Sequence, residues 1–273
     1  MKLSIIISTY NSPEWLEKVL WGYQKQTFLD FEILIADDGS NFETADLIHK
    51  MKNQVSFPLH HIWQKDEGFR KCEILNKAIL ASSSEYLIFS DGDCIPRADF
   101  VEQHHSRMKA NHFLSGGTVR LPLQLSKITS QENIKSQEVF DKFWLLKNGL
   151  KISFLKKLKL TKNKSLSEKL NRLTLTKATW NGGNSSAWKK DILAVNGFEE
   201  RMHYGSEDRE FGERMINNGI HGIQIRYSAI SVHLDHNRSY SNETHLKENK
   251  QFWKNTKQFK SCWTPYGLIK AEK

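Results

Sequence analysis

Three short apolar segments in the first third of the chain end abruptly in polar residues, and this pattern limits the possible folds more than any other feature. The segments, residues 2–9, 31–36 and 86–89, are rich in β-branched and aromatic residues and too short for helices, which predicts buried strands. Amphipathic helical patterns lie between them. Because strands that alternate with helices indicate βαβ units, we predict an α/β fold with a mostly parallel central sheet flanked by helices.

The polar residues that follow the predicted strands are expected to form one site. The carboxyl ends of parallel strands meet at one edge of a sheet, and ligands of open α/β sheets bind just beyond that edge. The chain has no GxGxxG motif after the first strand and no GxxxxGK[ST] motif, so a nucleotide would be held here by carboxylates and a metal ion. The candidate nucleotide-binding residues at the strand ends are Thr9, Tyr10, Asn11, Asp38, Asp91 and Asp93.

Asp91 and Asp93 form the candidate metal site. The single glycine between them lets two carboxylates converge on one hard cation. Mg²⁺ or Mn²⁺ held by one or two carboxylates keeps positions for water and for phosphate oxygens, which suits a substrate that carries a diphosphate. The alternative is a tight turn, because Asp-Gly is also a common hairpin sequence.

Asp38 and Arg70 are further candidates for nucleotide binding. The Asp38 carboxylate can accept hydrogen bonds from the imide N–H of a uracil or from ribose hydroxyls. Alternatively, the segment around it is only a turn with a helix cap. Arg70 lies at the start of a predicted helix, where it can reach a phosphate or remain an exposed surface charge.

A second group of candidates lies between residues 180 and 214. The loop that contains Gly182 and Gly183 is polar and flexible, and aromatic residues beside such a loop suit stacking on a sugar ring. Trp180 and Tyr204 are the aromatic candidates, although each could instead belong to the core. These four residues are the predicted contacts to the donor or acceptor sugar.

Acidic and imidazole side chains complete the predicted site. Glu207 and Asp208 begin a predicted helix, whose N-terminus would keep a carboxylate ionised and able to act as a base. His233 and His236 follow a predicted strand. Either could be a metal ligand beside the acidic pair or a surface residue, and we prefer His233 because it directly follows the apolar residue.

The remaining segments are predicted to be helical, apart from two strands. The strands cover residues 59–63 and 111–121, and residues 131–150 are predicted to be helical. Ser12, Ser165 and Ser206 precede helical patterns and are predicted to cap them.

Positive charge is concentrated in residues 151–177, which carry nine basic residues and one acidic residue. This segment has a net charge of +8, so the rest of the chain contributes only +1 to the total of +9. Because the rest of the chain is nearly neutral, the basic segment is expected to bind an anionic partner locally. Membrane head groups and anionic glycans are favoured over nucleic acid as that partner. An apolar stripe of Leu166, Leu170 and Leu173 indicates either an interfacial helix on an anionic membrane or a solvated arm that packs its leucines on the body.

Targeting and redox features suggest a cytoplasmic location. No apolar run approaches the roughly 20 residues of a membrane-spanning helix, and the first apolar run is too short for a signal peptide. Cys72, Cys94 and Cys262 lack CxxC spacing, which argues against a disulfide framework or a zinc site. We expect a cytoplasmic protein that residues 151–177 can attach peripherally to the inner face of the membrane.

Several segments resemble family 2 glycosyltransferases, which have the nucleotide-binding GT-A fold. In the N-terminal half these segments are SIIISTYNSPEWLEKVL, ILIADDGS and EYLIFSDGD. The later segment GGNSSAWKKDILAVNGFEERMHYGSEDREFGERM is similar to a catalytic region shared by galactosyltransferases and bacterial chondroitin-type polymerases, and DEGFRKCEILNKAI is similar to a segment of those polymerases. The implied regions are a nucleotide-sugar-binding half at 1–125, a helical basic insertion at 126–177, an acceptor and catalytic half at 178–240 and a helical tail at 241–273.

The resemblance implies roles for the residues of the donor site. Asp38 would contact uridine, Asp93 would bind Mn²⁺ or Mg²⁺ directly, and Asp91 would lie nearer the ribose. His233 falls where galactosyltransferases have a metal-binding histidine.

The implied activity is that of an inverting, metal-dependent hexosyltransferase. It would move a hexose or N-acetylhexosamine from a UDP-sugar of the UDP-Gal, UDP-GalNAc or UDP-Glc type to a glycan or glycolipid acceptor, in the synthesis of a surface polysaccharide or lipopolysaccharide. Asp208 would be the base and Glu207 would hold the acceptor sugar. No Gln/Arg-rich acceptor motif of processive synthases is evident, which favours addition of a single sugar.

Two other classes of protein stay open at this point. A sugar-nucleotide nucleotidyltransferase would use a similar acidic sheet edge, but such enzymes have a glycine-rich loop with Lys or Arg after the first strand, where this chain has Tyr-Asn-Ser-Pro. A non-catalytic glycan-binding or nucleic-acid-binding protein would explain the basic segment but not the three acidic or polar strand ends.

Overall fold

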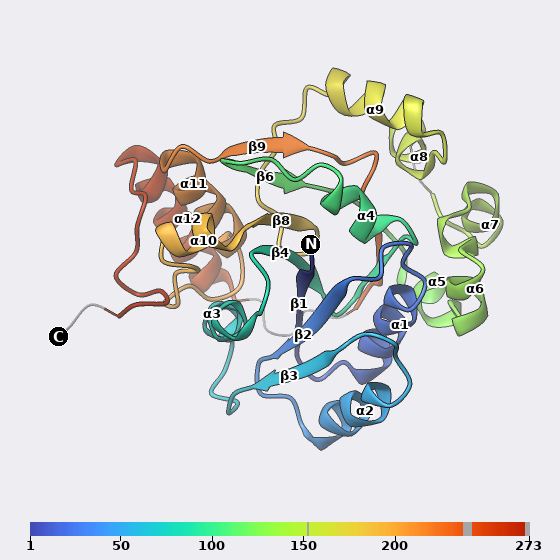
Figure 1. Cartoon of the computed structure of the whole chain (residues 1–273), viewed down its shortest axis with the longest axis horizontal. Helices are drawn as coiled ribbons and strands as arrows, with labels where there is room; N and C mark the ends of the chain where they lie inside the picture. The colour runs from blue at the N-terminus through green and yellow to red at the C-terminus, as the bar shows by residue number, and fades with distance from the viewer. Residues whose placement is uncertain (152, 237–241, 271–273) are drawn as a thin grey trace.

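A seven-stranded sheet forms the centre of the computed structural model, which describes residues 1–151, 153–236 and 242–270 (Figure 1). Its strands are β1 (Leu3–Thr9), β2 (Phe31–Asp37), β3 (Leu59–Trp63), β4 (Tyr86–Asp91), β6 (His112–Ser115), β8 (Ser185–Trp188) and β9 (His221–Gln224). They lie in the order β3-β2-β1-β4-β8-β6-β9. The first four of these are mutually parallel, β8 is antiparallel to both neighbours, and β6 and β9 are again parallel. The predicted α/β fold with a mostly parallel sheet is confirmed.

A second, three-stranded sheet positions His233 near the acidic loop after β4. Its strands are β5 (Cys94–Pro96), β10 (Ile230–His233) and β7 (Gly117–Arg120). β10 lies between the other two, antiparallel to β5 and parallel to β7. The register pairs His233 with Cys94, so the histidine at the end of β10 lies beside the acidic loop that follows β4.

Helices cover both faces of the main sheet because its central strands are apolar on both sides (Figure 1). Leu3, Ile5 and Ile7 of β1 belong to one buried core with residues of α1 and α2, whereas Ile6 belongs to a second core with residues of α3 and α11. This alternation is the period of two expected of a strand. The helices are α1 (Pro13–Tyr23), α2 (Phe42–Lys52), α3 (Lys71–Ala81), α4 (Phe100–His105), α5 (Leu123–Ile128), α6 (Gln131–Lys135), α7 (Lys142–Lys147), α8 (Phe154–Lys157), α9 (Lys164–Leu173), α10 (Lys189–Ala194), α11 (Glu207–Asn217) and α12 (Glu243–Gln258), with short 3-10 helices η1 (Glu138–Phe140) and η2 (Leu158–Leu160).

The segment 111–121, predicted as one strand, forms two strands, because the chain changes sheets within it. β6 belongs to the main sheet and β7 to the small one. The change occurs at Gly116 and Gly117, where a Cβ atom would collide with the Asn184 side chain and with the Arg226 carbonyl. Gly116 therefore allows the close approach of a side chain, and Gly117 that of a backbone carbonyl.

The segment 131–150 is helical as predicted, but in three separate pieces. The segment contains α6, η1 and α7, and Gln137 between the first two has a left-handed backbone with φ of 65°. Asp141 then caps α7 by accepting hydrogen bonds from the N–H groups of Phe143 and Trp144. These local bonds end one helix and begin the next, which the apolar spacing alone does not reveal.

Ser12 and Ser206 lie at the predicted N-cap positions of α1 and α11, whereas the predicted cap Ser165 is wrong. The cap of α9 is Asn163, whose side chain accepts from the N–H of Leu166, so Ser165 lies inside the helix. Ser12 and Ser206 do precede α1 and α11, but neither side chain makes a capping hydrogen bond. Pro13 and the acidic first turn of α11 supply the start signals there instead.

The predicted halves 1–125 and 178–240 share the main sheet, since β8 lies between β4 and β6. The segment between them holds α6 to α9, which Figure 1 shows at one side of the molecule, away from the sheet centre. The boundaries of the four regions stay predictions, and the one at 240/241 lies outside the described residues. Within the described ranges, no helix has the length and apolar character needed to cross a membrane.

A buried ion pair fixes α11, the helix that begins at the predicted catalytic acids. Arg214 is 1% exposed and donates to both carboxylate oxygens of Glu210 at 2.8 Å. Its remaining N–H groups donate to the Val195 and Gly197 carbonyls of the segment after α10. Thr256 of α12 also donates to Glu210, at 3.0 Å. The Arg214–Glu210 pair thus joins α11, α12 and the segment after α10.

We expect Arg214→Met to lower the free energy of unfolding by about 3 to 5 kcal/mol, because it leaves the Glu210 carboxylate buried without its partner. The measurement is chemical denaturation followed by circular dichroism. Arg172→Met, an exposed arginine of α9, is the matched control and should change stability by less than about 0.5 kcal/mol. Equal stability of both variants and the wild type would contradict this account of α11.

Candidate active site

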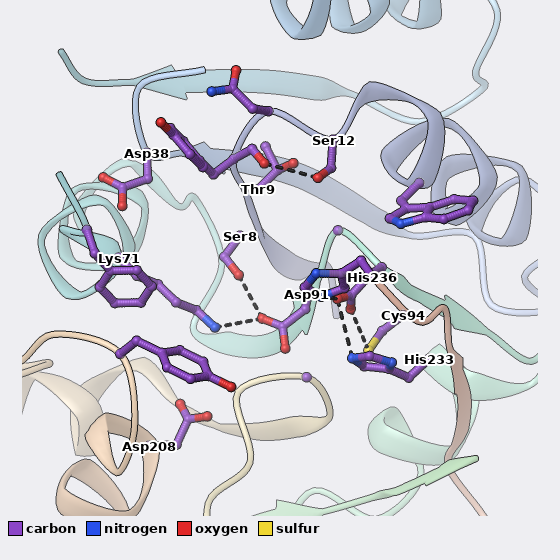
Figure 2. A pocket seen from close by; sticks show the side chains of 18 of the residues that line it. Ser8, Thr9, Ser12, Asp38, Lys71, Asp91, Cys94, Asp208, His233 and His236 are labelled. Carbon is purple, nitrogen blue, oxygen red and sulfur yellow. Dashed lines mark hydrogen bonds and ion pairs between the residues drawn. The ribbon is translucent and has the colours of Figure 1, made fainter. Parts of the chain in front are cut away.

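A pocket of about 680 Å³ opens at the carboxyl ends of β1 and β4 (Figure 2). The start of α11 and the end of β10 complete its walls. The strand ends therefore meet in one site, as parallel strands require. The predicted site residues that line the pocket are Thr9, Tyr10, Asn11, Asp38, Asp91, Asp93, Gly183, Tyr204, Glu207, Asp208 and His233. Arg70, Trp180 and Gly182 are not among its lining residues.

Asp91 is held by two donors at the centre of the pocket. Ser8 Oγ donates to Asp91 Oδ1 at 2.7 Å, and Lys71 Nζ donates to the same oxygen at 2.8 Å (Figure 2). Lys71 is the first residue of α3, so its side chain extends from the helix start toward the strand ends. These contacts fix the Asp91 carboxylate in one orientation.

Lys71 is a site residue that the sequence reasoning missed. Burial disfavours its ammonium, but the neighbouring carboxylates of Asp91, Asp208 and Glu207 outweigh this effect and raise the pKa of Lys71 well above its usual value. The ammonium therefore stays charged between the two acidic groups of the pocket. In the sequence, Lys71 follows Arg70 at the start of a helix, and nothing there distinguishes it from a solvated lysine.

Asp93 faces two histidines across the pocket floor. Its Oδ2 lies 2.9 Å from His236 Nε2 and 3.4 Å from His233 Nε2. Burial alone would raise the pKa of the Asp93 carboxyl, but the two imidazoles hold that pKa below its usual value. The sequence reasoning preferred His233 over His236, whereas the structure places both beside Asp93.

The donor atoms of Asp93, His233 and His236 fit a divalent cation. The three atoms lie within 4.8 Å of one another and belong to residues that are partly buried. One carboxylate with two imidazoles is a donor set that suits Mn²⁺ and other first-row metals better than Mg²⁺. A second group of Asp91, Asp93 and Cys94 satisfies the same distance, so Asp93 is the residue common to both.

Asp38 lies at the end of β2 with its carboxylate toward the pocket. It accepts hydrogen bonds from Gln64 Nε2 at 2.6 Å and from the backbone N–H of Arg70 at 2.8 Å. Burial nevertheless raises the pKa of Asp38 to about 6. The Arg70 side chain turns away from the pocket and pairs with Glu67 and Glu73, at 3.2 and 3.1 Å, so its position does not match the predicted phosphate contact.

Glu207 and Asp208 begin α11 on the opposite wall of the pocket. The N–H of Gly205 donates to Glu207 Oε2 at 2.7 Å, and the N–H of Gly182 donates to Asp208 Oδ2 at 2.9 Å. Asp208 Oδ1 is shielded from solvent and has no hydrogen-bond partner within the described part of the chain. Burial and the neighbouring Asp208 charge raise the pKa of Glu207 to about 7, and burial also raises the pKa of Asp208.

The glycines of the 181–184 loop allow the two walls to approach. A Cβ atom at Gly182 would lie 2.7 Å from Asp208 Oδ1, and one at Gly183 would lie 2.9 Å from Asp91 Oδ2. Gly182 thus packs against the Asp208 carboxylate and donates a hydrogen bond to it, although Gly182 does not line the pocket. The sequence had assigned both glycines to sugar contact, but their position shows a need for close packing against carboxylates.

The predicted aromatic pair is divided between the pocket and the core. Tyr204 lines the pocket and packs edge-on against Phe69, with ring centroids 5.9 Å apart. Trp180 is only 2% exposed, and its ring contacts Phe89 and Phe211 at centroid distances of 5.3 and 4.7 Å. Trp180 is therefore a core residue, and its predicted contact with a sugar is not supported by its position.

Comparison with known proteins identifies the family. The family model "Glycosyl transferase family 2" matches residues 4–183, which is more than half of the chain. The chain belongs to this family. A second model, described as the N-terminal domain of galactosyltransferase, matches residues 162–237. Both matches confirm the resemblance inferred from the sequence, and they favour a transferase over a nucleotidyltransferase or a non-catalytic binding protein.

Curated relatives of this glycosyltransferase chain include two polysaccharide synthases. Chondroitin synthase of Escherichia coli is 24% identical over 99% of this chain and 40% of the relative. Hyaluronan synthase of Pasteurella multocida is 24% identical over 90% of this chain and 25% of the relative. The chain thus spans less than half the length of either synthase.

Solved structures confirm a GT-A-like fold. Staphylococcus aureus TarS 1–349 in complex with UDP-GlcNAc superposes with a TM-score of 0.61 at 16% identity, covering 93% of this chain and 65% of that one. The Pyrobaculum calidifontis mannosyltransferase PcManGT in complex with GDP-Man and Mn²⁺ gives a TM-score of 0.57 at 15% identity, covering 87% and 58%.

We expect His236→Ala and His233→Ala each to weaken Mn²⁺ binding by at least about tenfold, because each removes one imidazole ligand. Isothermal titration calorimetry with Mn²⁺ alone measures the affinity directly. His49→Ala, at an exposed position of α2, is the matched control and should bind as the wild type does. Unchanged affinity in both site variants would place the cation elsewhere.

Proposed function

We propose that this chain is an inverting, metal-dependent glycosyltransferase that moves a hexose or N-acetylhexosamine from a UDP-sugar to a hydroxyl of a glycan or glycolipid. One observation carries the proposal. A single pocket brings the candidate metal ligands around Asp93 together with two carboxylates at the start of α11. Family membership and the polysaccharide synthases among the relatives support the same reaction class.

The donor nucleotide would lie along the ends of β1 and β2. Asp38 points into the pocket and could accept a hydrogen bond from the uracil imide or from a ribose hydroxyl. Tyr10 and Asn11 line the same region, and Tyr10 Oη donates to Asp66 at 2.9 Å. TarS has been solved with UDP and with UDP-GlcNAc, which favours a uridine nucleotide.

The cation-binding residues would be Asp93, His233 and His236. A divalent cation bound there supplies positive charge to balance the charge that develops on the departing diphosphate. Asp91 and Lys71 lie next to this group and carry opposite charges joined by a hydrogen bond. The Lys71 ammonium is also placed to attract the phosphate oxygens of the donor, because it lines the pocket and stays charged.

Asp208 is the proposed base. Its unpartnered Oδ1 and its place on the pocket wall leave it able to accept the proton of an acceptor hydroxyl. As that proton moves to Asp208, the hydroxyl oxygen bonds to the anomeric carbon, and the bond from this carbon to the phosphate oxygen breaks. A single displacement from the opposite face inverts the sugar's configuration. Glu207 would hold a hydroxyl of the acceptor sugar beside the base.

We expect Asp208→Asn to lower the turnover number by about 10²- to 10⁴-fold while leaving UDP-sugar affinity within about twofold, because the amide keeps the shape of the carboxylate but cannot take a proton. The measurements are steady-state transfer rates and calorimetric donor binding. Asp46→Asn, on the exposed side of α2, is the matched control and should transfer at the wild-type rate. Loss of donor binding together with activity would contradict the role of Asp208 as base.

We expect the transfer rate, measured as kcat/KM, to rise with pH, because only the ionised base can accept a proton. Burial raises the pKa of both Glu207 and Asp208, so this rise should occur above the usual range of a carboxyl. The Lys71 ammonium lowers the pKa of Asp208, so Lys71→Met removes this effect and raises that pKa. The rise of kcat/KM with pH should therefore occur at higher pH in this variant. A rise at the same pH as in the wild type would contradict Asp208 as the titrating base.

A further inference from the structure

Helix α9 is attached to the body through polar residues. Asn171 Nδ2 donates to Ser228 Oγ at 2.7 Å, and Asn171 Oδ1 accepts from the N–H of Tyr227 at 2.9 Å. Ser167 is 6% exposed and accepts a hydrogen bond from Ser228 Oγ at 3.3 Å. Ser167 and Asn171 are four residues apart and share one face of the helix. The inner face of α9 is therefore its polar face.

Two leucines of the predicted stripe on α9 are exposed to solvent, and the third, Leu170, is half-buried. Leu166 is 39% exposed, Leu173 is 77% exposed, and Leu175, just after the helix, is 99% exposed. Leu166 and Leu173 lie seven residues apart on one side of the helix, about a quarter turn from Ser167. An ordinary surface helix buries its apolar stripe against the core, whereas α9 leaves Leu166 and Leu173 at the side of the helix and exposed. The alternative of an arm that packs these leucines on the body is thereby excluded for Leu166 and Leu173.

Exposed basic residues surround these leucines. Lys162, Lys164, Lys169, Arg172 and Lys177 are all exposed, and they lie in the segment 151–177 that carries a net charge of +8. Its single acid, Glu168, faces Arg107 at 3.6 Å. Outward leucines among unopposed basic side chains match the chemistry of an anionic bilayer, whose head groups attract lysine and whose acyl boundary accepts leucine.

The same segment is tied to the wall of the pocket. Lys159 Nζ donates to the Thr118 carbonyl at 3.0 Å, and Thr118 lines the pocket. Arg97 Nη1 donates to the Thr161 carbonyl at 3.2 Å, directly before α9. Figure 1 shows α8 and α9 projecting at one edge of the molecule, where the sheet does not cover them.

We propose that α9 and its flanking residues 162–177 dock on the surface of an anionic lipid bilayer. The leucines would enter the boundary between head groups and acyl chains, and the basic side chains would contact lipid phosphates. Docking would place the pocket wall at Thr118 near the membrane, where a lipid-linked acceptor would be presented. Docking of α9 on a membrane does not require the proposed transfer reaction. It can therefore be tested without donor, acceptor or metal.

The test is flotation of the full chain with vesicles, using phosphatidylglycerol mixed with phosphatidylcholine against phosphatidylcholine alone. The variant replaces Leu166, Leu173 and Leu175 by serine, and the matched control is Leu29→Ser, a leucine that is 72% exposed elsewhere on the surface. A second variant, with Lys162, Lys164 and Lys169 replaced by glutamine, separates charge from apolar contact. Circular dichroism checks that each variant is folded.

We expect binding to the anionic vesicles that weakens with added salt, and little binding to phosphatidylcholine alone. The triple leucine variant should bind about tenfold or more weakly, as should the lysine variant, whereas Leu29→Ser should bind as the wild type. No preference for anionic vesicles, or full binding by the triple leucine variant, would overturn the proposal. Leucine-dependent self-association in sedimentation without lipid would assign the surface to a second copy and would also overturn it.

Discussion

The antiparallel pairing of β8 with β4 is the contact on which the site depends. It places Ser185 opposite Phe89, just before the acidic loop, so the 181–184 loop reaches Asp91. The buried imidazole of His104 contacts β8 and the residue before it. Its Nε2 lies 3.0 Å from Asn184 Oδ1, and its Nδ1 lies 2.8 Å from Ser186 Oγ. Burial lowers the pKa of His104 to about 4, so it makes these bonds as a neutral imidazole. This pairing therefore positions the 181–184 loop between Asp91 and Asp208.

The pocket contains both negatively and positively charged side chains. Carboxylates lie on both walls, at Asp91 and Asp93 on one side and at Glu207 and Asp208 on the other. Lys71 lies between them and offsets part of the repulsion, and the two histidines partner Asp93. A site of this kind is suited to a substrate that brings both negative phosphate and a divalent cation, because each finds a partner already oriented.

Much of this arrangement could be predicted from the sequence, because the apolar runs and the acids that follow them are local signals. The parallel strands, the convergence of their ends, and the positions of Asp38 and Asp93 follow from that pattern, whereas Asp208 was found from the start of a helix. Long-range contacts were not predictable in the same way. Lys71 matters only because α3 directs it to Asp91, and Trp180 is buried only because three other elements close around it.

The errors have the same physical origin. A run such as 111–121 has the composition of one strand, but the position of Asn184 against Gly116 divides it between two sheets. The leucine stripe of α9 was visible in the sequence, yet the exposure of Leu166 and Leu173 depends on Asn171 and its bonds to the body. Composition predicts which side chains can be buried, and only the tertiary contacts decide which of them are.

The most direct test of the central claim is calorimetric binding of a panel of nucleotide sugars to the wild type and to Asp93→Ala, each with Mn²⁺ and with a chelator. We expect one UDP-sugar to bind to the wild type only with the cation, and Asp93→Ala to remove this binding. Absence of nucleotide-sugar binding under every condition, or binding that needs neither the cation nor Asp93, would contradict it.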